Sequence, residues 1–263
     1  MTDKRIEIVN SFYGTYDEDA RLVKSRHGQL EYAVTMEYIH RFAEKGCRIL
    51  EVGAGTGRYS VALAGEGYAV TAVELVESNL AVLRQNGSGL KNLCALQGDA
   101  TDLSRFADGA FDVTLVLGPL YHLYQPADVQ KAIDEAIRVT RPGGVLFFAF
   151  LPIYAVMASN YLTGGWQAGE ELNFTPDYRV RHFAEQLFTG YDVAEFEALF
   201  ADKDVDPIAT VGTDWLLEPM EGRPDFAFSD EAFDRFTRWY LAVCEKRELL
   251  GSTNHLLYLC RRR

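Results

Sequence analysis

The residues best suited to bind a ligand lie between positions 49 and 58, where an apolar run ends in a carboxylate and three alternating glycines follow. Glu51 is the carboxylate, and Gly53, Gly55 and Gly57 are the glycines. Glycine has no Cβ, so the backbone can approach a ligand closely, and the start of a following helix offers unpaired N–H groups. The run therefore predicts a loop that binds a nucleotide-type cofactor.

The charge and spacing of this loop favour a cofactor without phosphate. A dinucleotide loop has the spacing G-x-G-x-x-G and holds a pyrophosphate, whereas here the third glycine, Gly57, comes one residue early and Arg58 follows it. Glu51 would repel a pyrophosphate by about 4 kcal/mol at ~4 Å and an effective dielectric constant near 20. The same carboxylate would attract an ammonium or a sulfonium group. S-adenosylmethionine (SAM) carries both groups and no phosphate.

Here the sequence resembles the class I SAM-dependent methyltransferases, whose first motif typically has the form E/D-x-G-x-G-x-G. Later motifs follow in the order of that family: strand 70–74 ending in Glu74, strand 93–97 followed by Gly98-Asp99-Ala100, strand 111–117, and the turn Arg141-Pro142-Gly143-Gly144. The resemblance covers about residues 47–152. Each motif has a plainer interpretation alone, as turn chemistry, a helix cap or a paired buried acid, and the ordered series favours the cofactor.

The resemblance also implies a role for individual residues. The acid that matches Glu74 takes the two ribose hydroxyls, and the aspartate that matches Asp99 accepts from the adenine amino group, with a neighbouring backbone N–H reaching the ring. In small-molecule members the N-terminal segment folds over the cofactor, so Arg21 is a candidate to clamp the methionine carboxylate at two points, although an exposed arginine on a helix or loop is the alternative. The predicted cofactor-binding residues are Tyr16, Arg21, Glu51, Gly53, Ala54, Gly55, Gly57, Glu74, Leu75, Asp99, Ala100 and Leu117.

The loop after the fourth strand, residues 118–124, is expected to border the methyl group, because ligands bind at the carboxyl ends of parallel strands. His122 is the candidate general base, since its ordinary pKa of ~6.5 suits proton removal near neutrality. Tyr121 is a candidate to shape the acceptor pocket or bind the acceptor. For both residues, hydrogen bonding or packing without catalysis is the alternative.

The predicted function is transfer of the SAM methyl group by in-line displacement to an oxygen, nitrogen or carbon atom of a small molecule. The loop resembles those of the quinone-biosynthesis-like members (methyltransferase type 11/12). A SAM-binding regulatory protein without catalysis is the first alternative, and an RNA- or tRNA-directed methyltransferase is another. Glu51 and the early Gly57 argue against an NAD-dependent oxidoreductase, and the absence of acids in residues 118–124 argues against an aminopropyl transferase.

Alternating apolar strands and helical patterns predict an α/β fold with a mostly parallel sheet and helices on both faces. From the resemblance we expect a Rossmann-like sheet of seven strands with the last strand antiparallel beside the fifth. The expected divisions are an N-terminal helical cap over the cofactor (1–46), a SAM-binding core (47–152), a lid or substrate insertion rich in aromatic residues such as Trp166 (153–190), and a C-terminal completion of the same domain (191–263).

Composition limits the partners. The 263 residues carry 38 acids against 26 bases, a net charge of −12, which disfavours binding to nucleic acid. The four cysteines are scattered, and we expect no metal site. Without an apolar leader after the amino terminus or an 18-residue apolar stretch, we expect a cytoplasmic protein with no membrane association, either a monomer or a homodimer.

Overall fold

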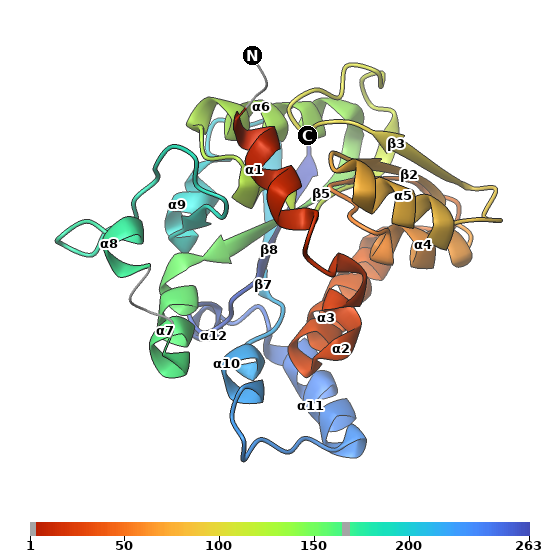
Figure 1. Cartoon of the computed structure of the whole chain (residues 1–263). Coiled ribbons are helices and arrows are strands. Elements are labelled where there is room, and N and C mark those ends of the chain that lie inside the picture. Colours follow the sequence, from red (N-terminus) through yellow and green to blue (C-terminus); the bar gives the residue numbers. More distant parts are fainter. Residues whose placement is uncertain (1–3, 165–168) are drawn as a thin grey trace.

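The computed structural model describes residues 4–164 and 169–263, and these form an α/β fold with one central sheet (Figure 1). Trp166, predicted to belong to the lid, lies outside the described residues. The strands are β1 (Arg48–Val52), β2 (Ala69–Glu74), β3 (Leu93–Gln97), β4 (Phe111–Val116), β5 (Thr140–Pro152), β6 (Gly190–Tyr191), β7 (Val205–Gly212) and β8 (Leu256–Arg262).

The strand order is β3-β2-β1-β4-β5-β8-β7, and β6 pairs separately with β5. Strands β1 to β5 are parallel, whereas β8 runs antiparallel between β5 and β7. The antiparallel last strand beside the fifth is therefore confirmed. The count of seven strands is wrong, because the described residues contain an eighth, the two-residue strand β6. The predicted turn at 141–144 is also wrong, since β5 already begins at Thr140 and passes through these residues with a shift in register against β4.

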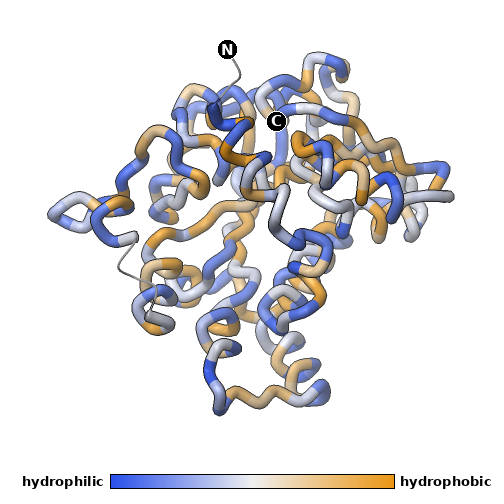
Figure 2. Tube along the Cα trace, viewed as in Figure 1, coloured by the Kyte–Doolittle hydropathy of each residue, from blue (hydrophilic) through white to orange (hydrophobic). Residues whose placement is uncertain are grey.

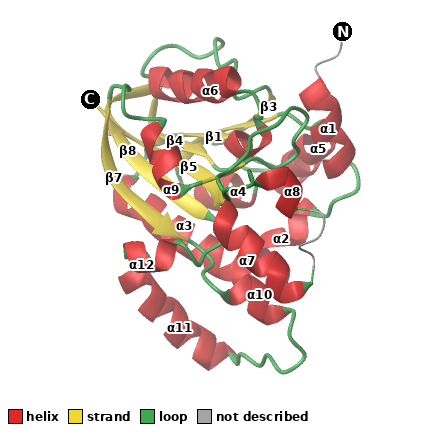
Figure 3. Cartoon of the chain, turned by 90° about the vertical axis from the view of Figure 1, so that its left-hand side faces the viewer, coloured by secondary structure: helices red, strands yellow, loops and turns green. Residues whose placement is uncertain are grey.

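Helices cover both faces of the sheet, as predicted (Figure 3). The α-helices are α1 (Lys4–Tyr13), α2 (Arg21–Lys24), α3 (Arg26–Phe42), α4 (Arg58–Gly65), α5 (Glu77–Asn86), α6 (Pro126–Val139), α7 (Ile153–Thr163), α8 (Glu170–Asn173), α9 (Val193–Ala198), α10 (Leu217–Glu221), α11 (Asp230–Val243) and α12 (Arg247–Leu250). The described residues also contain two short 3₁₀ helices, η1 (Glu18–Ala20) and η2 (Pro119–His122). Helices α6 and α9 pack on one face, and α3, α4 and α11 pack on the other.

The core lies along the strands, whose apolar residues colour the centre of the chain trace (Figure 2). Strands β1, β4 and β8 contribute side chains to both core clusters, which is the pattern expected of strands covered on both faces. Helix α6 turns one apolar face to the sheet and ends at Val139, directly before β5. This packing fixes the carboxyl ends of the strands, where a ligand would bind. No helix within the described residues is long and apolar enough to cross a membrane.

Candidate active site

A cavity of about 920 Å³ opens at the carboxyl ends of β1, β2 and β4. Its walls come from the glycine loop after β1, from the residues that follow β2, β3 and β4, and from the N-terminal helices. The topology therefore brings motifs from four separate parts of the sequence to one site.

The glycine loop needs glycine at its first position for two reasons. Gly53 has a φ of +75°, a conformation that residues with a Cβ rarely adopt. A Cβ on Gly53 would also lie 2.5 Å from Cδ of Pro119, in the loop after β4. The N–H groups of Gly53 and Ala54 both donate to the carbonyl oxygen of Val73, at 2.8 and 3.1 Å. The loop is thus held between β2 and the β4 loop, with its backbone along the cavity.

Glu51 is buried beneath this loop, with 1% of its surface exposed, and still lines the cavity. The hydroxyl of Ser60, on α4, donates to Oε2 of Glu51. Burial raises the pKa of Glu51 to about 8, because desolvation penalises the charged form. The site therefore holds a carboxyl group that a positively charged ligand would ionise.

Glu74 ends β2 and is fixed by two backbone donors. The N–H of Gly55 donates to its Oε2 at 2.7 Å, and the N–H of Val76 donates to its Oε1 at 2.8 Å. Burial raises its pKa, and these two hydrogen bonds oppose that shift. A carboxylate oxygen can accept two hydrogen bonds, so each oxygen has capacity for one ligand hydroxyl. This geometry suits a vicinal diol.

Asp99 lies at the far end of the cavity and pairs with Arg5 of α1. Its Oδ1 accepts from the backbone N–H and the hydroxyl of Thr101, each at 2.9 Å. Burial opposes ionisation of Asp99, but the Thr101 N–H and the Arg5 guanidinium outweigh it and hold its pKa below the ordinary value. A donor on a ligand would therefore meet an ionised carboxylate that already has a cationic partner.

Arg21 also lines the cavity, but the pair of N–H groups that could bind a carboxylate at two points already binds a carboxylate of the protein. Its Nη1 and Nη2 donate to Oε2 and Oε1 of Glu31, on α3, at 2.8 and 3.0 Å, and its Nε donates to Glu18 at 3.2 Å. A guanidinium has five N–H donors, so single N–H groups remain for a ligand. The predicted two-point clamp of a ligand carboxylate by Arg21 does not fit this arrangement, because both terminal nitrogens of the guanidinium already donate to Glu31.

His122 and Tyr121, from η2, form the end of the cavity near β4. Nδ1 of His122 lies 2.8 Å from the carbonyl oxygen of Leu187 and so carries the proton, which leaves Nε2 to accept from the Tyr13 hydroxyl at 3.0 Å. Burial lowers the pKa of His122 to about 4. The imidazole is thus neutral near pH 7, and its accepting nitrogen already has a partner. Tyr121 donates to the carbonyl oxygen of Leu117 at 3.3 Å.

The cavity brings together most of the predicted residues. Those that line it are Arg21, Glu51, Gly53, Ala54, Gly55, Glu74, Leu75, Asp99, Ala100, Leu117, Tyr121 and His122. Tyr16 does not line it; the residue is 42% exposed, and its ring stacks on that of Phe12 with the ring centroids 5.1 Å apart. Gly57 does not line it either, and a Cβ there would lie 2.8 Å from Leu83 of α5, so Gly57 serves helix packing. None of the described residues between 153 and 190 lines this cavity, and that segment reaches the site through the Leu187 carbonyl behind His122.

Several lining residues were missed in the sequence, and one group had a usable signal. Arg5, Val9 and Tyr13 are spaced four apart on α1, so they share one helix face, and all three line the cavity. That face spans the site from Asp99 to His122. Glu18, Tyr59 and Asn79 also line the cavity, and no motif marked them in advance.

Comparison with known proteins agrees with this geometry. Residues 50–148 match the family model described as a methyltransferase domain. The demethylmenaquinone methyltransferase of Clavibacter sepedonicus is 36% identical over 129 residues, 49% of this chain and 50% of that protein. The ubiquinone biosynthesis O-methyltransferase of Xylella fastidiosa strain M23 is 35% identical over 117 residues, 43% of this chain and 46% of that protein. The matches thus span about half the length of these curated relatives.

The fold extends the likeness to the whole chain. A SAM-dependent methyltransferase from Thermotoga maritima, described as a possible histamine N-methyltransferase, superposes with a TM-score of 0.63 over 98% of this chain and 100% of that one, at 16% identity. At that identity the likeness concerns the fold alone. The chain is therefore similar to the methyltransferase domain over residues 50–148, and it shares the fold of SAM-dependent methyltransferases over nearly its whole length.

Proposed function

We propose that this protein transfers the methyl group of SAM to a small-molecule acceptor by in-line displacement. The observation that carries the proposal is the pair of buried carboxylates, Glu51 and Glu74, on either side of the glycine loop at the carboxyl edge of the sheet. Glu51 faces the proposed position of a cationic amino group, and Glu74 has two free acceptor positions for a ribose diol. Two carboxylates beside the glycine loop would repel a pyrophosphate, which supports SAM over a dinucleotide.

In this proposal the ends of the cavity bind the ends of the cofactor. Asp99 and the backbone at Ala100 take the adenine, Glu74 takes the ribose, and Glu51 takes the methionine ammonium. Leu117 then borders the sulfonium. The protein's contribution to rate is alignment of the acceptor opposite the S–CH₃ bond and exclusion of water, which can lower a barrier by ~7–11 kcal/mol.

The acceptor is proposed to be a small molecule for two reasons. The chain has a net charge of −12, and it is similar, over about half of their length, to methyltransferases named for quinone biosynthesis. A phosphate backbone would be repelled by that charge. His122 is proposed to position Tyr13 rather than to take a proton, since its Nε2 already accepts from that hydroxyl.

The test is calorimetric titration with S-adenosylhomocysteine, followed by assay of methyl transfer from SAM. We expect binding of S-adenosylhomocysteine, none of NAD, and label from methyl-labelled SAM in a small acceptor. Binding of NAD in place of S-adenosylhomocysteine would overturn the cofactor assignment. Binding of S-adenosylhomocysteine without transfer to any acceptor of a broad panel would favour a regulatory SAM-binding protein.

A further inference from the structure

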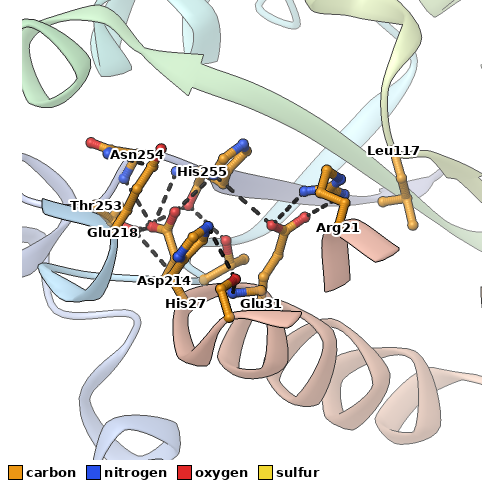
Figure 4. A network of polar contacts seen from close by, with 12 residues as sticks. Arg21, His27, Glu31, Leu117, Asp214, Glu218, Thr253, Asn254 and His255 are labelled. Atoms are coloured by element: carbon orange, nitrogen blue, oxygen red, sulfur yellow. Dashed lines mark hydrogen bonds and ion pairs between the residues drawn. The ribbon is translucent and has the colours of Figure 1, made fainter. Parts of the chain in front are cut away.

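A row of buried charges around His255 extends away from the cofactor cavity (Figure 4). Arg21 donates to Glu31, whose Oε2 lies 3.9 Å from Nδ1 of His255, and that Nδ1 lies 2.7 Å from Oδ2 of Asp214. Burial disfavours the imidazolium of His255, but Glu31 and Asp214 outweigh it and raise its pKa to about 9. Each of these charges therefore faces an opposite charge within the row, and the row fastens the N-terminal helices to the start of β8.

A separate cavity of about 100 Å³, by contrast, contains a polar group that the fold leaves unused. Leu123 and Tyr124, which directly follow η2, line this cavity, whereas Tyr121 and His122 of η2 line the cofactor cavity. The start of α6 and parts of the segment 182–199 complete its walls. The two cavities share no lining residue, so they are distinct sites on either side of one loop.

The pairing of β6 with the end of β5 brings Thr189 to this cavity. A Cβ on Gly190 would lie 2.8 Å from Cβ of Ile153, so glycine permits the close approach of β6 to the start of α7. The N–H of Thr189 donates to the carbonyl oxygen of Tyr121 at 2.6 Å. Thr189 is thereby fixed between β6 and η2, in the wall of the cavity.

The hydroxyl of Thr189 is a buried polar group without a partner. Thr189 is 1% exposed, and its Oγ1 makes no hydrogen bond to any residue that the structure describes. The charged pair in the same wall is satisfied, because Nε2 of His182 lies 2.7 Å from Oε1 of Glu195, and Oε2 of Glu195 accepts from the N–H of Asp192. Buried hydroxyls in folded proteins are nearly always hydrogen-bonded, so Thr189 indicates a missing ligand atom.

The other walls of the cavity favour an apolar occupant. The ring centroid of Tyr191 lies 5.0 Å from that of His182, which gives the cavity an aromatic side. One water molecule needs only ~10–15 Å³ but two to four polar partners, so water suits neither the volume nor the lining. The apolar residues that line the cavity are Leu123, Pro126, Val129, Tyr191 and Leu199.

We propose that this cavity is a second small-molecule site, separate from the cofactor site, for a neutral molecule of about one ring that hydrogen-bonds to Thr189 through a hydroxyl group. An engineered cavity of about 150 Å³ binds benzene, which sets the scale for one ring, and the cavity here opens to solvent at one side. A charged molecule does not fit, because both oxygens of Glu195 and one ring nitrogen of His182 already have partners. The inference is independent of the proposed function, since none of these residues lines the cofactor cavity.

The probes for this inference are 4-fluorophenol and fluorobenzene, which share a ring and differ by one hydroxyl group. Their fluorine resonances are followed in NMR titrations of the full chain. We expect the wild type to bind both probes. Thr189→Val keeps the shape of the side chain but removes its hydroxyl, so it should weaken binding of 4-fluorophenol about 3- to 10-fold, the value of one hydrogen bond, and leave fluorobenzene within twofold.

Thr237→Val is the matched control. Oγ1 of Thr237 also makes no hydrogen bond within the described part of the chain, but Thr237 lies on α11, which packs on the opposite face of the sheet from α6 and α9. This variant should therefore bind both probes as the wild type does. An equal loss of affinity for 4-fluorophenol in Thr237→Val and Thr189→Val would overturn the assignment of Thr189.

A further variant and a competition experiment test the place of binding. Leu199→Trp fills the cavity from the half-buried C-cap of α9 and should abolish binding of both probes, whereas saturating S-adenosylhomocysteine should leave their binding unchanged. Absence of binding to the wild type at millimolar concentrations, or displacement of the probes by S-adenosylhomocysteine, would overturn the inference. Failure of S-adenosylhomocysteine itself to bind would instead overturn the proposed function, and the two variants would still decide this inference.

Discussion

The burial of Glu51 makes a strong prediction about stability. The residue has 1% of its surface exposed, and burial raises the pKa of its carboxyl group from 4.5 to about 8. In the unfolded chain the same group regains its ordinary pKa. Folding without a ligand therefore holds a proton on Glu51 throughout the neutral range, and Glu51→Gln mimics that protonated form at every pH.

The sign and size of the effect follow from this difference in pKa. Below pH 4.5 Glu51 is protonated in both states, so it does not change the free energy of unfolding with pH. Between pH 4.5 and 8 the unfolded state loses the proton first, and the free energy of unfolding falls as pH rises. A difference of 3.5 units (8 minus 4.5) corresponds to about 5 kcal/mol at 1.36 kcal/mol per unit, reached fully above pH 8.

Urea unfolding of the ligand-free protein at pH 5 and pH 8.5 measures this directly. Relative to wild type, Glu51→Gln should gain about 2–5 kcal/mol between the two pH values, because glutamine cannot ionise. Glu77→Gln is the control, since Glu77 is exposed on α5 and should show no gain. Parallel pH dependence in wild type and Glu51→Gln would refute the claim that the site buries a protonated carboxyl group.

Three further outcomes are expected. Gly53→Ala should lower the free energy of unfolding by at least about 1–2 kcal/mol, the cost of a positive φ, because its Cβ also meets Pro119; an unchanged urea midpoint would contradict the loop geometry. Glu74→Gln should weaken S-adenosylhomocysteine binding by about 10- to 100-fold in calorimetry, the value of charged hydrogen bonds to a diol, and undiminished affinity would remove Glu74 from the ribose site. Burial lowers the pKa of His122 to about 4, so between pH 6.5 and 4 the wild type should lose stability relative to His122→Asn as pH falls; an unchanged difference between the two proteins in urea unfolding would show an exposed imidazole.

The cofactor loop could be predicted because its chemistry is local. The spacing from Glu51 to Gly55 and the acid at the end of β2 lie within short segments, and parallel strands necessarily deliver their carboxyl ends to one edge. Asp192 with Glu195 also forms a capping box at the start of α9, a pattern that only four residues determine. Where the interaction partners are close in sequence, residue types and their spacing were sufficient to predict the local structure.

The partners of the charged residues could not be predicted in this way, because they depend on packing between distant segments. Arg21 has the right chemistry to clamp a carboxylate, but the carboxylate it meets is Glu31, ten residues later on a helix that folds back beside it. His255 had no motif around it, and only the pairing of β8 with β5 brings it beside Asp214 and Glu31. Likewise, Tyr16 is prominent in the sequence, whereas Tyr13 faces the cavity from the last turn of α1.

The central claim is that the cavity at the carboxyl edge of β1, β2 and β4 holds SAM. A crystal structure of the protein with S-adenosylhomocysteine tests it most directly. We predict the ribose hydroxyls on Glu74, the amino group toward Glu51 and the sulfur beside Leu117. A ligand bound elsewhere, or bound here with its ribose away from Glu74, would contradict the account.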